Sequence, residues 1–134
     1  MLRNISLRIC RCRKLSYEKL GAGAGDPIIM CHGLMGNRNN FYSVGKMLSK
    51  KTNRTVYSLD MVNHGKARWS DTASYEEMSE EVTEAIKTLC NGSAALIGHS
   101  MGGRVSMMAA LANTTMVSSL IVVDVSPSTE RHIS

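Results

Sequence analysis

Short apolar runs alternate with longer amphipathic segments along the chain. Four of the runs are apolar with almost no polar alternation, which is typical of strands that are buried on both faces of a parallel sheet. These predicted strands are residues 28–31, 55–59, 94–97 and 120–123. A shorter alternating segment, residues 15–20, predicts an edge strand, and the glycine-rich residues 21–27 after it predict a flexible turn.

Two amphipathic segments and a third, helix-compatible run separate the apolar runs, and in the amphipathic segments the apolar residues recur at the three- and four-residue spacing of a helix. The first predicted helix, residues 39–50, is capped by Asn39 or Asn40. Its predicted buried stripe consists of Phe41, Val44, Met47 and Leu48. The third predicted helix, residues 101–112, follows closely after an apolar run.

The second predicted helix, residues 75–89, opens with a capping box formed by Ser74 and Glu77 and ends at Asn91 and Gly92. Its predicted buried face consists of Tyr75, Met78, Val82, Ala85, Ile86 and Leu89. Its predicted water-facing side chains are Glu76, Glu80, Glu81, Glu84 and Lys87. We interpret this acidic cluster as a solvated face and expect no metal there.

The alternation of strands and helices predicts an α/β fold of parallel strands with helices on both faces of the sheet. Polar side chains follow directly from four of the predicted strands: His32, Asp60, Ser100 and Asp124. Parallel strands end at one edge of a sheet, and open α/β sheets bind their ligands at that edge. The sequence therefore predicts a functional site there.

The net charge of +5 is confined to the start of the chain. Residues 1–20 contain six Arg and Lys and one Glu, which sums to +5, so the remaining residues are neutral. A neutral body without a basic stripe argues against a nucleic-acid partner. The arm resembles a mitochondrial presequence in composition, although a solvated basic tail would have the same composition. We therefore divide the chain into a basic presequence-like arm, residues 1–20, and one domain, residues 21–134, and expect a mitochondrial location, in the matrix.

The four cysteines do not have the spacing of a metal site. Cys10 and Cys12 lie in the arm, while Cys31 and Cys90 stand in apolar surroundings, as expected for buried thiols in a reducing compartment. No glycine-rich nucleotide-binding sequence follows the first strand, so we expect no cofactor. No apolar run approaches the roughly 20 residues of a membrane-spanning helix.

Residues 98–102 read G-H-S-M-G, the form G-x-S-x-G, between a predicted strand and a predicted helix. In this context the central serine is held in a strained backbone conformation. Ser100 is then a candidate nucleophile, and the Met101 N–H, at the start of the helix, is a candidate donor to an anion formed there. The residues that support this turn are Gly98, His99 and Gly102. A glycine-flanked serine is also common in ordinary turns, so the motif alone does not distinguish a catalytic serine from a serine in an ordinary turn.

A second glycine-rich loop, residues 32–36, reads H-G-L-M-G directly after an apolar run. Glycines let backbone N–H groups turn toward a ligand, so the Leu34 N–H is a second candidate anion donor, with His32 and Gly33 as supporting residues. The same loop would also serve as a plain connection. His64 is either catalytic or structural, and its place before the serine favours the structural role.

Together these segments closely resemble the α/β-hydrolase superfamily over residues 15–130. The segments that carry the resemblance are H-G-L-M-G at 32–36, D-M-V-N-H-G at 60–65, Y-E-E-M at 75–78, G-H-S-M-G-G at 98–103 and D-V-S-P at 124–127. The resemblance implies that Ser100 is the nucleophile, that the Leu34 and Met101 amides form an oxyanion hole, and that the substrate is a small-molecule carboxylic ester of acyl or lipid type. It implies the amino-terminal half of a hydrolase core, truncated after about the sixth strand, without the lid and the last strands.

Chain order in this superfamily is nucleophile, acid, histidine, and only His132 follows Ser100 here. His132 stands just past the last predicted strand, whereas the family's histidine follows a later one. Asp124 is a candidate acid, or it caps the turn after the last strand. Two hypotheses stay open: a piece of a serine esterase, or a truncated product that acts as a non-catalytic binding protein. Under both we expect these 134 residues to turn over little ester.

Overall fold

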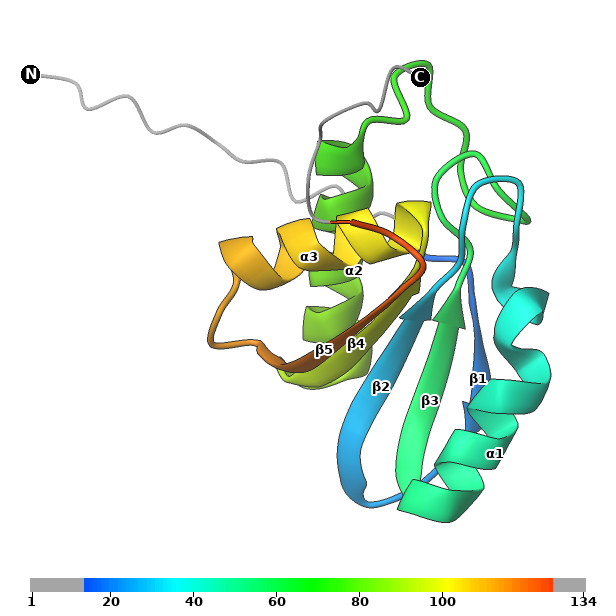
Figure 1. The fold of residues 1–134 in the computed structure, drawn as a ribbon, viewed down its shortest axis with the longest axis vertical. Helices are drawn as coiled ribbons and strands as arrows, with labels where there is room; N and C mark the ends of the chain where they lie inside the picture. Colours follow the sequence, from blue (N-terminus) through cyan, green and yellow to red (C-terminus); the bar gives the residue numbers. More distant parts are fainter. Residues whose placement is uncertain (1–13, 127–134) are drawn as a thin grey trace, which may run out of the picture.

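Residues 14–126 are described by the computed structural model, and they form one sheet with helices on both faces (Figure 1). The strands are β1 (Tyr17–Gly21), β2 (Gly25–Cys31), β3 (Arg54–Leu59), β4 (Ala94–His99) and β5 (Val117–Val123). The helices are the 3-10 helix η1 (Arg38–Phe41) and the α-helices α1 (Tyr42–Thr52), α2 (Tyr75–Leu89) and α3 (Met101–Ala112). Every strand and helix that the pattern predicts is present, in the predicted order.

The strand order across the sheet is β1-β3-β2-β4-β5. Neighbouring strands are parallel except for β1, which pairs antiparallel with β3 and is the one departure from the predicted parallel arrangement. Only residues 22–24 connect β1 to β2, and such a short connection cannot make the crossover that parallel strands need. β1 therefore runs opposite to β2 and to its parallel neighbour β3.

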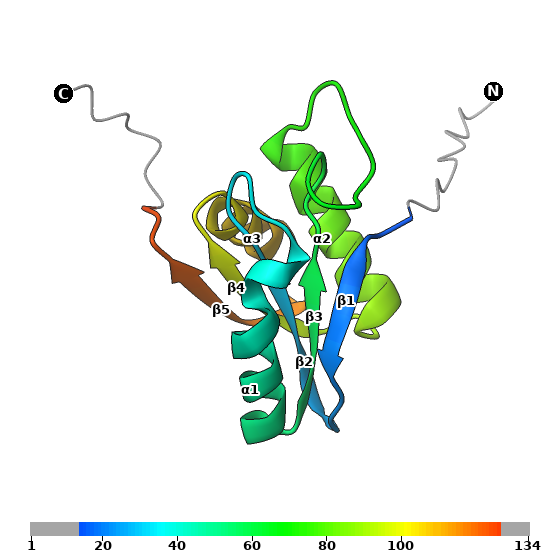
Figure 2. The ribbon, with the colours of Figure 1, turned by 90° about the vertical axis from the view of Figure 1, so that its right-hand side faces the viewer.

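Helix α1 covers one face of the sheet, and α2 and α3 cover the other (Figure 2). The residues of β2 divide alternately between the two faces. Ile28 and Met30 join the apolar cluster beneath α1, while Ile29 and Cys31 join the larger cluster beneath α2 and α3. This strand is buried on both sides, which explains why its sequence lacks polar alternation. The predicted cover on both faces is confirmed.

The cap of the first helix is Asn37 rather than Asn39 or Asn40. The Asn37 side chain accepts a hydrogen bond from the Asn39 N–H at 2.9 Å, and the Asn40 side chain accepts one from the Asn37 N–H at 2.8 Å. The chain therefore enters α1 through η1, a turn earlier than predicted.

Helix α1 also presents a different face to the sheet from the predicted one. Its closest approach is at Gly45, where a Cβ would collide with the Leu20 side chain. The stripe predicts burial for Val44 and Met47, but they are 46% and 48% exposed, so this part of the prediction is wrong. The stripe residues that do pack against the sheet are Phe41 and Leu48.

Helix α2 begins at the predicted residue, with the Ser74 hydroxyl accepting a hydrogen bond from the Glu77 N–H at 3.1 Å. This is one half of the predicted capping box; the Glu77 carboxylate accepts from Arg68, Ser70 and Thr72 instead of supplying the other half. The buried apolar residues of α2 are Met78, Val82, Ala85 and Ile86. Two predictions for the faces of this helix are wrong. Tyr75 is exposed, and Glu81 is buried because its carboxylate accepts a hydrogen bond from Arg68 Nε at 2.5 Å.

Cys31 and Cys90 are buried free thiols, as predicted. Burial raises the pKa of each thiol to about 11, so both stay protonated at neutral pH. Among residues 14–126, no group of three or more His, Cys, Asp or Glu side chains is arranged to hold a metal ion.

The predicted basic arm falls mostly outside the described part of the chain, as do Cys10, Cys12 and His132. Residues 17–20 of that arm form most of β1. In the described part of the chain, no helix combines the length and the apolar character that crossing a membrane requires.

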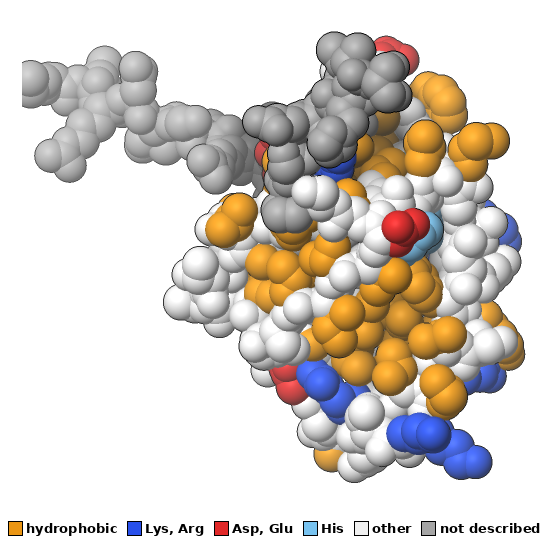
Figure 3. Space-filling model, viewed as in Figure 1, with side chains coloured by type: hydrophobic (Ala, Val, Ile, Leu, Met, Phe, Trp, Pro, Cys, Tyr) orange, Lys and Arg blue, Asp and Glu red, His pale blue; other side chains and the backbone are white. Residues whose placement is uncertain are grey.

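The sheet face beside α1 is only partly covered where β4 meets β5 (Figure 3). Register pairs Ile121 of β5 with Ile97 of β4, and Ile97 belongs to the apolar cluster on the α1 side. Ile121 and Val123 are 56% and 45% exposed. We call this surface the open face; it consists of Ile97, Ile121 and Val123.

Candidate active site

Ser100 lies at the junction of β4 and α3, where its backbone adopts φ 52° and ψ −116°. Such a conformation costs a non-glycine residue on the order of 1–3 kcal/mol and persists only where the surroundings enforce it. Two glycines provide those surroundings. A Cβ on Gly98 would collide with the Gly102 carbonyl oxygen, and a Cβ on Gly102 with the Cys31 carbonyl oxygen. Strand β4, helix α3 and strand β2 therefore meet with no side chain between them.

Backbone hydrogen bonds hold Ser100 from both sides. Its N–H donates to the Val123 carbonyl oxygen at 3.0 Å, and its own carbonyl accepts from the N–H groups of Gly103 at 2.9 Å and Arg104 at 3.1 Å. Its hydroxyl has no hydrogen-bond partner among residues 14–126, and the residue lines a cavity of about 200 Å³. A fixed backbone and an unengaged hydroxyl suit a nucleophile.

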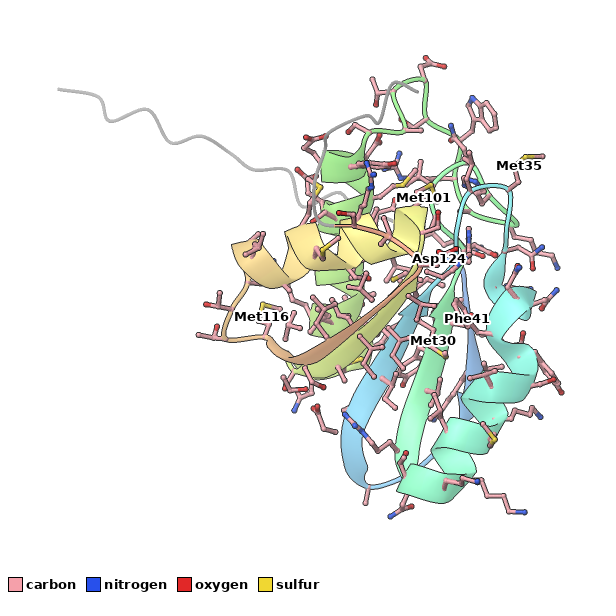
Figure 4. The ribbon with its side chains drawn as sticks, viewed as in Figure 1. Met30, Met35, Phe41, Met101, Met116 and Asp124 are labelled. Atoms are coloured by element: carbon pink, nitrogen blue, oxygen red, sulfur yellow. The ribbon has the colours of Figure 1, made fainter. Side chains whose placement is uncertain are left out.

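The cavity is lined by Gly33, Leu34, Met35, Gly36, Asn40, His99 and Ser100. Its outer wall is a turn that closes through a hydrogen bond from the Gly36 N–H to the Gly33 carbonyl oxygen at 3.0 Å. Met35 is 90% exposed, and its side chain points away from the body of the protein (Figure 4). The Leu34 N–H has no acceptor within the described residues. Asn40, which the sequence suggested only as a helix cap, also lines this cavity.

The turn packs directly on the serine. A Cβ on Gly33 would lie 2.9 Å from His99 Nδ1 and 3.3 Å from Ser100 Cβ. On the other side of the serine, the Met101 N–H belongs to the first turn of α3, where N–H groups have no intrahelical acceptor and the helix dipole is positive. The Met101 side chain is buried in the apolar cluster between the sheet and helices α2 and α3.

His32 is buried and bonded at both ring nitrogens. Nδ1 lies 2.7 Å from the Gly33 carbonyl oxygen, and Nε2 accepts the Met61 N–H at 3.0 Å. Burial lowers the pKa of this imidazole, against the opposing effect of the bond to Gly33, so the ring is neutral near pH 7. The side chain therefore links the loop after β2 to the loop after β3.

Asp60 organises the loop after β3. Its carboxylate accepts hydrogen bonds from the Arg38 N–H at 2.8 Å, the Ser16 hydroxyl at 2.7 Å and the Lys66 N–H at 3.0 Å. Burial alone would raise the pKa of this carboxyl, but the three donors and the Arg38 charge together lower it below its usual value. Asp60 is thus an ionised anchor between three segments.

His64, the second histidine near this edge, has no ring nitrogen available to Ser100. Its Nε2 accepts the Met35 N–H at 3.1 Å, and its Nδ1 lies 2.8 Å from the Val62 carbonyl oxygen. The geometry favours the structural role over the catalytic one. The contact with Met35 joins residues 29 positions apart, and no local sequence signal predicts it.

Asp124 follows β5 at the same edge of the sheet, with φ 55° and a side chain that is 87% exposed. One carboxylate oxygen lies 3.9 Å from Nε2 of His99, the residue before Ser100. Figure 4 shows Asp124 close to the start of α3, where Met101 begins the helix. The predicted site residues of both loops and of the β4–α3 turn thus gather at one edge, and Asp124 lies beside them.

These features define a class of protein, and the chain belongs to the α/β-hydrolase family: the family described as "alpha/beta hydrolase fold" matches residues 26–133. The sn-1-specific diacylglycerol lipase ABHD11 of Danio rerio is 40% identical over 124 residues, which cover 92% of this chain and 39% of that protein. A Saccharomyces cerevisiae protein named "Probable alcohol acetyltransferase" is 45% identical over 104 residues, covering 75% of this chain and 30% of that protein.

Among solved structures, a marine microorganism esterase superposes with a TM-score of 0.83 at 37% sequence identity. The match covers 91% of this chain and 46% of the esterase. The chain therefore corresponds to less than half the length of the relatives it matches, and its fold is that of part of their hydrolase core.

Proposed function

We propose that this chain carries the nucleophile and the anion-binding groups of a serine-dependent hydrolase of carboxylic esters. The observation that carries the proposal is the strained Ser100, which only the two neighbouring glycines permit and which lines a cavity with its hydroxyl unpaired. Strain of this kind is retained where it serves a function.

The proposed chemistry is acyl transfer through a covalent intermediate. Ser100 Oγ attacks the ester carbonyl carbon and loses its proton to a base, while the C=O electron pair moves onto the carbonyl oxygen. Collapse of this intermediate breaks the bond to the alcohol, which leaves with a proton, and water then releases the acid. The N–H groups of Leu34 and Met101 would stabilise the negative oxygen, a contribution of about 3–4 kcal/mol for one such donor.

The proton acceptor is the missing part of this proposal within residues 14–126. His32 and His64 use both ring nitrogens on backbone groups, and His99, which lines the same cavity, has its Nε2 3.9 Å from Asp124 and no hydrogen bond to the Ser100 hydroxyl. Asp124 is the proposed acid that would orient a histidine supplied by another part of a longer hydrolase. We therefore expect the 134-residue chain to turn over little ester. Without the triad, oxyanion donors and substrate binding accelerate such a reaction by only on the order of 10³–10⁴ over the rate in water.

The relatives suggest the kind of substrate. The Danio rerio protein is named a diacylglycerol lipase and the yeast protein an alcohol acetyltransferase, and both names describe an acyl group on an alcohol oxygen. We propose a small-molecule ester of acyl or lipid type, and, from the basic arm, a mitochondrial location.

Among the described residues no histidine is hydrogen-bonded to the Ser100 hydroxyl, which favours one second candidate, a non-catalytic protein that keeps the cavity for binding. An activated ester such as p-nitrophenyl butyrate distinguishes the two. Incubation followed by peptide mass spectrometry should find the butyryl group on Ser100 and nowhere in Ser100→Ala. A folded chain that is not acylated at Ser100, yet binds the ester, would support the binding protein.

A further inference from the structure

His32 and His64 stand in different loops, and each holds the loop of the other. His32, after β2, accepts the Met61 N–H from the loop after β3 at 3.0 Å. His64, after β3, accepts the Met35 N–H from the loop after β2 at 3.1 Å. The centroids of the two rings are 5.1 Å apart. The two loops are therefore joined reciprocally at the carboxyl edge of the sheet.

The partners of His64 fix its proton. A backbone N–H only donates, so the Nε2 atom that faces Met35 carries no proton. A backbone carbonyl only accepts, so Nδ1 carries the proton and donates it to the Val62 oxygen at 2.8 Å. The ring has no capacity left for a substrate, and any effect on the reaction passes through Met35.

Two peptide planes flank Leu34 in the turn of residues 33–36. In the first plane, the Gly33 carbonyl accepts from His32 Nδ1 at 2.7 Å and from the Gly36 N–H at 3.0 Å. A trans peptide is planar, so holding this carbonyl also fixes the direction of the Leu34 N–H. In the second plane, the Met35 N–H is held by His64.

The second plane needs such a restraint. Met35 has φ 62°, a left-handed conformation that costs a residue with a side chain about 1–2 kcal/mol. The Met35 side chain is exposed and contributes little packing to hold it there. The hydrogen bond from Met35 to His64 therefore restrains the Leu34–Met35 plane, in addition to the Gly36–Gly33 bond that closes the turn.

We propose that His64 is a positioning residue for the turn that carries the anion donor of this site: it fixes the Leu34–Met35 peptide, the plane after the one that His32 holds, and so keeps the turn, and with it the Leu34 N–H, beside the cavity at Ser100. The importance of that direction for catalysis rests on the proposed function, whereas the contact itself does not.

The first test uses the unmodified chain, labelled with ¹⁵N. A scalar coupling between the Met35 amide nitrogen and His64 Nε2, with Nε2 in its unprotonated form, is expected. A protonated Nε2 at neutral pH, or a Met35 amide that exchanges with solvent as fast as an unprotected one, would overturn the proposal.

The second test compares two substitutions that both remove the ring. The side chain of Gln reaches about as far as Nε2, whereas that of Asn reaches only as far as Nδ1. We expect the Met35 amide to exchange about tenfold or more faster in His64→Asn than in the unmodified chain, and His64→Gln to recover most of the protection. The rate at which a fluorophosphonate labels Ser100 should be highest in the unmodified chain, lower in His64→Gln and lowest in His64→Asn.

The two readouts separate the failure of this proposal from failure of the proposed function. Met35 exchange that is the same in all three proteins overturns the positioning role, whatever happens to labelling. Exchange in the expected order, with no labelling of Ser100 in any protein, supports the positioning contact and contradicts the proposed hydrolase.

Discussion

At the scale of single residues, the site depends on positions where no side chain fits. Ser100 adopts a strained conformation because Gly98 and Gly102 let strand and helix approach one another to backbone contact. The strain is local, while the forces that maintain it come from the packed strands on either side.

This geometry predicts a large difference between two glycine substitutions. Gly102→Ala should lower the free energy of unfolding by about 3 kcal/mol or more, because the new methyl group meets the Cys31 and His32 carbonyl oxygens. Gly92→Ala should cost only about 1 kcal/mol, since Gly92 has φ 87° but open space around it. Urea unfolding of both variants measures the difference, and equal losses would contradict this account of the turn.

The sequence predicts some of the site residues and not others, for a physical reason. The motif around Ser100 places the proposed nucleophile, the two glycines and Met101 within a few residues, so the local pattern is sufficient to predict their arrangement. The contact of His64 with Met35 depends instead on how two loops meet after the sheet has formed, and the hydrogen-bonding partner of a histidine has no periodicity to reveal it.

At the scale of elements, a partly buried cluster of one arginine and two glutamates attaches α2 to the loop before it. Arg68 donates to Glu81 at 2.5 Å and to Glu77 at 2.7 Å, and Glu77 also accepts from Ser70 and Thr72. The hydrogen bond from Arg68, followed by those from Ser70 and Thr72, lowers the pKa of Glu77 to about 2. The interpretation of Glu81 as part of a solvated face missed this, because its partner Arg68 lies outside the helix.

The ion pair predicts a pH-dependent stability. Because the pKa of Glu77 is lower when folded than its ordinary value of 4.5, its contribution is full above about pH 4.5 and is lost as the pH falls toward 2. Arg68→Met should therefore lower the free energy of unfolding by about 1–2 kcal/mol at pH 7, and by progressively less below pH 4.5. A difference between the two proteins that stays constant from pH 7 to pH 2.5 in urea unfolding would contradict this explanation.

The helices also show how far periodicity predicts packing. The prediction for α2 is correct over most of its length because its apolar residues form one stripe. Helix α1 approaches the sheet most closely at Gly45, which has no side chain and so does not contribute to a hydrophobic pattern. The pattern therefore predicts burial for Val44 and Met47, which are exposed.

At the scale of the whole molecule, the described residues leave an apolar surface at the β5 edge of the sheet. The open face carries no charged side chain on β5, and its exposed residues gather beside α1 (Figure 3). Unpaired strand edges with apolar side chains promote association between chains. The relatives, of which this chain covers less than half, have further polypeptide that could cover such a surface.

The open face predicts that the 134-residue chain self-associates in solution. Ile121→Lys should raise the dissociation constant by about tenfold or more, because it buries a charge in any contact on this face. Leu111→Lys is the matched control, since Leu111 is equally apolar and more exposed but lies near the end of α3, which covers the opposite face of the sheet (Figure 2). Sedimentation velocity over a concentration series measures both, and an unchanged distribution for Ile121→Lys would contradict the prediction.

The central claim is that Ser100 is held ready as a nucleophile at the β4–α3 turn. The most direct test is labelling of the purified chain with a fluorophosphonate probe, beside Ser100→Ala, with circular dichroism to show that both are folded. The account predicts slow labelling that is confined to Ser100 and absent from the variant. A folded chain that is not labelled, or a variant that is labelled to the same extent, would contradict it.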